Sequence, residues 1–335
     1  MLERPDLLDE LIISHIEHDF GLHVARLTFL PLGADFNTAV YRLVTENETA
    51  YFLKLRRGDF DEITVAVPHC LKAQGNPAII APLETKTGRL WARMGVYTTI
   101  VYPFVEGQDG YQVTLSDQQW REFGAALKGI HTAQIPPDIA RLIPNETFSP
   151  HWREMVKTFQ AQIEEATYDD PTAAKFAVLM KARQGEISQL VSRADELGFM
   201  LKNRPLDPVL CHTDIHAGNL HIGTDGALYI VDWDNPVSAP KERDLMLVGG
   251  SYVWNSSREE DLFYQGYGRT AIDRIALAYY RYERIVQDIA AYCEQLLSTD
   301  EGGEDREQGY QYFTSNFLPG HEIEIAFRTD PLFAS

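Results

Sequence analysis

Cysteine is scarce in this sequence, and long apolar runs are missing. The 335 residues include only three cysteines, Cys70, Cys211 and Cys293, which are scattered and odd in number. This usage argues against a disulfide framework or a zinc site and fits a reducing cytosol. No stretch approaches the roughly 20 apolar residues that a membrane span needs. The first ten residues are acidic and lack the apolar segment of a signal peptide, so we expect a cytoplasmic protein with no membrane partner.

Basic residues are also in short supply. The chain has 30 Lys and Arg against 49 Asp and Glu, which gives a formal net charge of −19 at pH 7. Such a surface repels nucleic acid and anionic membranes, and it attracts cations. We therefore expect no nucleic-acid partner. A cationic small-molecule partner fits the sign of the charge, although acidity also serves solubility alone.

The remaining composition is that of an ordinary globular protein, with 44% hydrophobic and 24% charged residues. No internal repeat is present. A chain of 335 residues exceeds a usual single domain and can bury a sizeable core, so we expect two lobes.

The most informative segment reads His-Thr-Asp-Ile-His-Ala-Gly-Asn over residues 212–219, and Asp-Trp-Asp follows at residues 232–234. Residues 208–212 and 227–232 are short, apolar and β-prone, and residues 223–226 form a turn with two glycines. We therefore expect residues 213–219 to lie in a loop beside a hairpin of these two strands. An Asx-rich turn with a buried aspartate is the alternative.

The residue types of this segment suit proton transfer beside a metal-bound phosphate. Asp214 can orient or deprotonate an attacking hydroxyl, while Asn219 and Asp232 offer the oxygen ligands that Mg²⁺ prefers. A metal pair of His212 and His216 is a competing interpretation. Their i, i+4 spacing brings two imidazoles together only on a helix, and a Gly-Asn turn between strands argues against one.

The pattern H-x-D-x-x-x-x-N followed by D-x-[DG] resembles the catalytic and metal-binding segments of kinase-fold phosphotransferases. The Ile-His-Ala-Gly-Asn run and the Asp-Trp-Asp form are similar to the aminoglycoside phosphotransferase and choline kinase branch. A protein kinase is disfavoured because no Ala-Pro-Glu segment follows Asp232, and the chain reaches Pro240 within eight residues. The resemblance implies an α+β, protein-kinase-like two-lobed fold.

The resemblance also implies lobe boundaries and a nucleotide site. We expect a small antiparallel-sheet lobe at residues 1–102 with an extra helix near residues 6–18, a hinge at 103–107, and a mostly helical lobe at 108–335, with ATP between the lobes. Lys54 lies in the apolar strand of residues 50–55, where a buried lysine needs an anionic partner. The family implies that Lys54 binds the α- and β-phosphates. An edge-strand lysine that only extends its ammonium group to solvent is the alternative.

Glu62 is the implied partner of Lys54, because it opens the next helical stretch, residues 62–71. Asp61 is adjacent, Pro68 should kink that helix, and an ordinary first-turn acid is the alternative for Glu62. The expected phosphate loop, residues 32–38, has one glycine where protein kinases have three, and we expect Asp35 there to face solvent or the acceptor.

Two further helices and one bracing aspartate complete the expected lobe. Ser116 and Gln119 form the capping box of a helix that ends near His131, which we interpret as structural. Asp244 is implied to brace the catalytic loop through backbone hydrogen bonds, with a helix cap as the compatible alternative. A long amphipathic helix is expected over residues 274–293. Its sequence is similar to family members that phosphorylate spectinomycin.

The sequence thus predicts an ATP- and Mg²⁺-dependent O-phosphotransferase. It would act on a hydroxyl of a cationic aminocyclitol or aminoglycoside antibiotic, with spectinomycin preferred, and would confer resistance. The alternatives are a same-fold kinase for choline, a sugar or homoserine, and a non-catalytic pseudokinase that binds nucleotide or drug. Asp234, Glu283 and Asp288 are open between contact with substrate amines and packing ion pairs.

Overall fold

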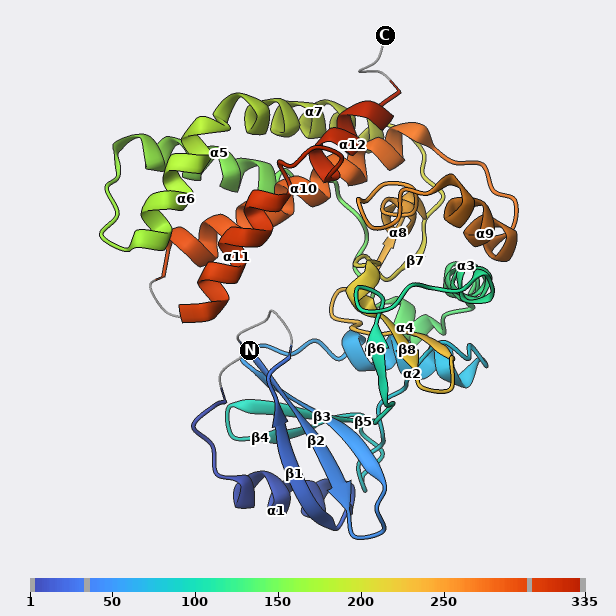
Figure 1. Cartoon of the computed structure of the whole chain (residues 1–335). Coiled ribbons are helices and arrows are strands. Elements are labelled where there is room, and N and C mark those ends of the chain that lie inside the picture. The colour runs from blue at the N-terminus through green and yellow to red at the C-terminus, as the bar shows by residue number, and fades with distance from the viewer. Residues whose placement is uncertain (1–3, 33–36, 300–302, 332–335) are drawn as a thin grey trace. The chain divides into compact units, whose positions relative to one another are not determined.

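The computed structural model describes residues 4–32, 37–299 and 303–331, and their contacts divide the chain into two compact units (Figure 1). The first unit comprises Met1–Pro144 and His216–Pro236, and the second comprises Asn145–Ile215 and Val237–Ser335. The lobe boundaries at residues 102 and 108 stay a prediction. In the part of the chain that is described, no helix has both the length and the apolar character of a membrane span.

An antiparallel sheet dominates the beginning of the first unit (Figure 1). Its strands are hydrogen-bonded in the order β1–β2–β3–β5–β4, and every neighbouring pair is antiparallel. The strands predicted at residues 50–55 and 97–103 are both present in it. The bounds are β1 (Val24–Leu30), β2 (Thr38–Thr45), β3 (Ala50–Arg57), β4 (Ala92–Met94) and β5 (Tyr97–Pro103).

Helix α1 (Asp9–Phe20) explains which way Lys54 points. Ile12 and Ile16, one turn apart on α1, are fully buried and share a core cluster with Leu53 and Leu55 of β3. Successive residues of a strand face opposite sides of the sheet. Lys54, between the two leucines, therefore points away from the α1-covered face.

The rest of the first unit consists of two stretches of the chain. One runs from the end of β5 to Pro144, and the other is His216–Pro236, which follows the first segment of the second unit. The expected helix at residues 62–71 is α2, which continues through Pro68 to Ala73. The expected capping box is confirmed, because Ser116 accepts from the Gln119 N–H and the Gln119 side chain bonds back to residue 116. The bounds are α2 (Ile63–Ala73), β6 (Gly107–Asp109), α3 (Asp117–His131), α4 (Pro137–Ala140), η1 (Ala217–Asn219), β8 (Leu220–Gly223) and β9 (Leu228–Ile230).

The predicted hairpin of residues 208–212 with 227–232 is wrong in its pairing. The turn at residues 223–226 joins β8 to β9, and β8 also pairs with β6 in a three-stranded sheet. The strand predicted at 208–212 is present as β7 (Val209–Cys211), but it pairs with β10 (Val237–Ala239). A short turn favours pairing of the strands that it joins directly, and residues 220–223 supply the nearer strand.

The second unit is mostly helical and is organised around α10 (Arg274–Leu297), the expected long helix. Asp273 caps α10 by accepting from the backbone N–H groups of Ile275 and Ala276. Helix α10 packs against α5, α6, α7, α8, α11 and α12, and the buried faces of all of these except α8 share one core cluster. The remaining bounds are α5 (His151–Glu165), α6 (Pro171–Ala182), α7 (Gln184–Lys202), α8 (Glu242–Leu245), α9 (Ser257–Tyr267), α11 (Gly303–Ser315) and α12 (Glu322–Thr329).

Candidate active site

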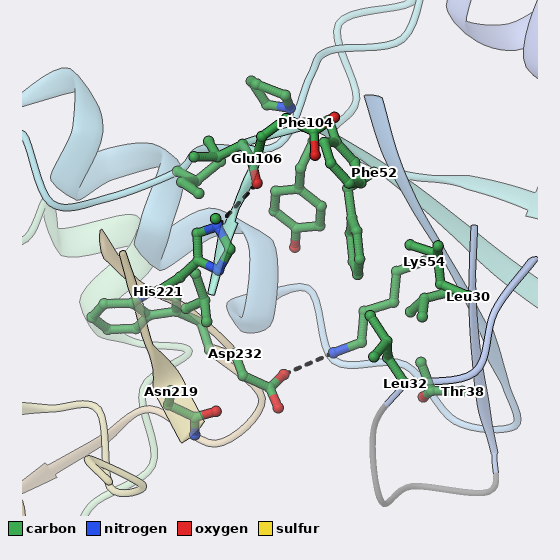
Figure 2. A pocket seen from close by; sticks show the side chains of 18 of the residues that line it. Leu30, Leu32, Thr38, Phe52, Lys54, Phe104, Glu106, Asn219, His221 and Asp232 are labelled. Carbon is green, nitrogen blue, oxygen red and sulfur yellow. Dashed lines mark hydrogen bonds and ion pairs between the residues drawn. The ribbon is translucent and has the colours of Figure 1, made fainter. Parts of the chain in front are cut away.

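The first unit contains a pocket of about 410 Å³, which Figure 2 shows from close by. This volume falls within the range of roughly 300–1,000 Å³ that small-molecule sites occupy. One part of the lining is apolar and comes mainly from the sheet, including Leu30, Val40 and Phe52. The polar part includes Lys54, Asn219, Asp232 and Asp234. The fold therefore brings three of the predicted site residues, Lys54, Asn219 and Asp232, to one cavity.

Lys54 is the cationic centre of this pocket. Its ammonium nitrogen lies 2.9 Å from Oδ1 of Asp232 and 2.9 Å from Oδ1 of Asp234, and its side chain is only 14% exposed. Burial alone lowers the pKa of Lys54, but the two carboxylates outweigh it and raise the pKa above its usual value. Lys54 is therefore a fixed positive charge, which is able to bind an anionic group such as a phosphate.

Asn219 and Asp232 reach the pocket from the two ends of the β8–β9 hairpin. Asn219 ends η1 directly before β8, and Asp232 lies two residues beyond β9. The Val231 N–H donates to the Asn219 carbonyl oxygen at 3.0 Å, which ties these two ends together. Asp232 has a φ of 66°, a left-handed conformation that aspartate tolerates better than most residues.

The pair supplies a donor set that fits Mg²⁺. A carboxylate and a carboxamide oxygen are hard ligands, and Mg²⁺ in phosphate sites commonly takes one or two protein oxygens, with the rest from water and phosphate. Figure 2 shows the side chains of Asn219 and Asp232 on the same side of the pocket, with Asp232 turned toward Lys54. Asn219 is buried, whereas the Asp232 side chain is 47% exposed.

The expected hinge, residues 103–107, lines the same pocket. His221 of β8 lies with Nε2 at 2.9 Å from the Val105 carbonyl oxygen, and the Thr224 N–H donates to the Glu106 carbonyl oxygen at 2.8 Å. Arg42 pairs with the Glu106 carboxylate and lies over the Phe104 ring at 5.0 Å. These contacts fix the backbone of this segment beside the pocket.

Asp214 lies in the second unit, in the loop that follows β7. Asp244 of α8 accepts the His212 N–H at 2.8 Å and the Thr213 N–H at 2.7 Å. Thr213 has a φ of 80°, which a β-branched residue adopts only when its surroundings hold it there. The predicted brace by Asp244 is confirmed, and it fixes the backbone directly before Asp214.

Replacing Asp244 with alanine should destabilise the protein, because His212 and Thr213 are buried and both N–H groups would lose their acceptor. We expect a loss of roughly 2–5 kcal/mol in the free energy of unfolding, measured by urea denaturation. Asp207→Ala, an exposed aspartate two residues before β7, is the matched control and should change little. Equal free energies of unfolding for the two variants would show that Asp244 does not stabilise this loop.

Comparison with known proteins identifies the family of the chain. The phosphotransferase enzyme family matches residues 28–283, which is more than half of the chain. The chain belongs to this phosphotransferase family. The predicted family and phosphotransferase activity class are thereby confirmed.

Two solved structures and one further protein are similar to this phosphotransferase. It is similar to a spectinomycin phosphotransferase in complex with ADP and spectinomycin, with 37% identity over 98% of this chain and 100% of that one and a TM-score of 0.90. A choline kinase from Streptococcus pneumoniae has a TM-score of 0.55 with 16% identity over 92% and 97% of the two chains, which shows the fold alone. Protein StrN of Streptomyces griseus is 27% identical over 246 residues, covering 70% of this chain and 74% of that protein. The kinase-like fold class is confirmed.

Glu62 does not lie in the pocket of this phosphotransferase. It occupies the N-cap position of α2, its side chain is exposed, and its carbonyl oxygen accepts from Val65 and Ala66. The carboxylates paired with Lys54 belong instead to Asp232 and Asp234. The assignment of Glu62 to the nucleotide site stays a prediction.

The acids that the sequence left open are all in ion pairs. Asp234 contacts Lys54 and also lies 3.2 Å from Nη1 of Arg56. Glu283 contacts buried Arg153 at 2.7 Å, and Asp288 contacts Arg284 at 3.0 Å. No local pattern pointed to Asp234 as a partner of Lys54, because the two positions are 180 residues apart.

Two predictions remain, one for His131 and one for Asp35. His131 is buried at the end of α3, as its structural interpretation expects. Residues 33–36, which include Asp35 and most of the expected phosphate loop, lie outside the described residues. The orientation expected for Asp35 stays a prediction.

Proposed function

We propose that this phosphotransferase transfers the γ-phosphoryl group of ATP to a hydroxyl group of a cationic aminocyclitol or aminoglycoside, with spectinomycin as the acceptor. The observation that carries the nucleotide part is the pocket in which Lys54, Asn219, Asp232 and the hinge segment meet. The acceptor rests on the similarity, over nearly the whole chain, to a protein whose structure holds ADP and spectinomycin.

Each residue has a role that follows from its chemistry. Lys54 binds the α- and β-phosphates, and Asn219 and Asp232 hold Mg²⁺, which neutralises charge on the phosphates when it is bound. Asp214 accepts the hydroxyl proton as the acceptor oxygen bonds to the γ-phosphorus and the bond to the bridging oxygen of ADP breaks. Alignment and charge neutralisation supply most of the rate.

The location and charge of the protein fit this activity. The three cysteines are free and buried, which suits a reducing cytoplasm, where ATP is also available. The net charge of −19 favours the approach of a cationic acceptor. We further propose that phosphorylation of the antibiotic confers resistance on a cell that expresses this protein.

An acceptor panel tests the proposal directly. Purified protein is given Mg-ATP with spectinomycin, choline, homoserine or a hexose, while ATP consumption is followed and products are identified by mass spectrometry. We expect ATP consumption and a phosphorylated product with spectinomycin alone. Phosphorylation of choline but not spectinomycin would overturn the acceptor, and bound ATP with no phosphorylated product would support a pseudokinase.

The resistance claim is tested separately in a spectinomycin-sensitive bacterium. Expression of the wild-type chain should raise the inhibitory concentration of spectinomycin, whereas expression of Asp214→Ala at the same level should not. Equal sensitivity of the two strains would contradict a resistance role.

A further inference from the structure

Arg284 of α10 bridges two carboxylates of the second unit. Its Nη1 donates to Oδ1 of Asp214, and its Nε lies 3.0 Å from Oδ1 of Asp288. Burial lowers the pKa of Arg284, but Asp288 and Asp214 outweigh it and raise the pKa, so the guanidinium is a permanent cation. The side chains of Arg284, Asp214 and Asp288 are 25%, 36% and 32% exposed, so a dissolved molecule can reach the group.

Separate parts of the scaffold hold the two sides of this bridge. Arg284 and Asp288 are one turn apart on α10, and the neighbouring residues Ile285 and Ile289 anchor the helix in the core. Asp214 follows the loop backbone that Asp244 fixes. The Arg284–Asp214 contact is therefore the joint between two positioned elements, and either partner can change its side-chain rotamer without refolding its backbone.

Arg284 donates a hydrogen bond to the Asp214 carboxylate, which is the group that accepts the hydroxyl proton in the proposed function. A carboxylate oxygen that receives a charge-assisted hydrogen bond from a guanidinium is less basic and has less room for an incoming hydroxyl. We propose that Arg284 is a resident cation that masks Asp214 until a cationic acceptor replaces it there. This inference rests on the proposed function and adds a positioning residue to it.

The surroundings favour exchange of one cation for another. Asp288 remains paired with Arg284 after Asp214 is released, so the displaced guanidinium keeps a counter-ion. An ammonium group of the acceptor can thus enter beside Asp214 while Arg284 turns toward Asp288.

The exchange would couple catalysis to the presence of the acceptor. With the mask in place, Asp214 is a poor base toward water, and bound ATP is spared from hydrolysis. In that side reaction a water oxygen bonds to the γ-phosphorus, its proton passes to Asp214, and the bond to the bridging oxygen breaks to give ADP and phosphate. Loss of the mask should therefore accelerate hydrolysis when no acceptor is present.

The first experiment measures ATP hydrolysis by the full chain with Mg-ATP and no acceptor. We expect R284Q to raise the rate at least about tenfold, because a freed general base contributes on the order of 10²–10⁴. R274Q, an exposed arginine at the start of the same helix, removes the same charge and should leave the rate unchanged. The double variant R284Q/D214N should lose the gain, since the gain depends on the base.

A second variant tests the same exchange through a different quantity, the KM for spectinomycin. D288N leaves Arg284 on Asp214 but weakens the position to which it retreats, so we expect wild-type hydrolysis and a several-fold higher KM for spectinomycin. This variant keeps the proposal testable if R284Q does not fold, which thermal denaturation reports. A purely structural role would instead lower kcat in both variants and leave the acceptor-free hydrolysis at the wild-type rate.

The outcomes separate this inference from the proposed function. Spectinomycin phosphorylation by the wild type reports on the function alone, while the hydrolysis comparison needs only ATP, Mg²⁺ and water. Unchanged hydrolysis in R284Q, or an equal rise in R274Q or in R284Q/D214N, overturns the mask. If R284Q does not fold, an unchanged KM for spectinomycin in D288N overturns it.

Discussion

Asp232→Ala should abolish Mg²⁺-dependent turnover. The substitution removes the carboxylate that we assign to the metal, and it also removes one of the two acids that position Lys54 at 2.9 Å. Lys54 keeps its contact with Asp234, so the pocket should persist while the metal site is lost. We expect kcat/KM to fall by about 10³-fold or more, as for loss of a major electrostatic contact in a transition state. Initial rates over a Mg²⁺ titration measure the change.

Asp225→Ala provides the matched control for this variant. Asp225 lies in the turn of the same β8–β9 hairpin, is exposed, and accepts the Ala227 N–H at 3.0 Å. Its loss should cost little activity, because it does not line the pocket. An Asp232→Ala enzyme with the wild-type dependence on Mg²⁺ would show that the metal is held by other groups.

Asp214→Ala should remove catalysis and leave nucleotide binding largely intact. Loss of a general base costs on the order of 10²–10⁴ in kcat. Nucleotide binding should survive because Asp214 belongs to the second unit, while the pocket is lined by residues of the first. Steady-state kinetics gives kcat, and isothermal titration calorimetry gives the Kd for Mg-ADP.

The isosteric variant Asp214→Asn separates the charge from the shape. It retains a side chain of the same size beside Arg284, so a loss of kcat equal to that of Asp214→Ala assigns the effect to the missing base. A wild-type kcat in either variant would refute the role of Asp214 in proton transfer.

The local sequence was sufficient to predict features that depend on residues within a single helix or strand. Lys54 alternates with two leucines in an apolar strand, and the fold places it on the face opposite those leucines. The capping box at Ser116 and the long helix at 274–297 follow equally from short-range patterns. Asp244 came from the family pattern, and its two backbone hydrogen bonds are present.

Features that depend on distant pairings were less accessible. The strand at residues 209–211 was expected, but its partner at 237–239 lies beyond two other strands, and strand propensity does not choose between partners. Asp234 and Lys54 meet from positions 180 apart, and Arg284 and Asp214 from positions 70 apart. The i, i+4 spacing of Arg284 and Asp288 explains one half of the bridge, whereas no local pattern points to Asp214.

For Glu62, the family pattern predicted a position in the sequence but could not predict which residues its side chain contacts. Glu62 lies directly before α2, yet its side chain is exposed, and Lys54 is paired with Asp232 and Asp234. Electrostatics explains the choice, because a buried ammonium pairs with the nearest available carboxylates. Binding of phosphates would compete with those two acids for Lys54.

A crystal structure with Mg²⁺, a non-hydrolysable ATP analogue and spectinomycin tests the central assignment most directly. We predict a metal ion bound by the oxygens of Asn219 and Asp232 and by the phosphates, with the Lys54 ammonium on the phosphates. We also predict a spectinomycin hydroxyl within hydrogen-bonding distance of Asp214. A nucleotide bound outside this pocket, or a metal ion that contacts neither Asn219 nor Asp232, would contradict this assignment.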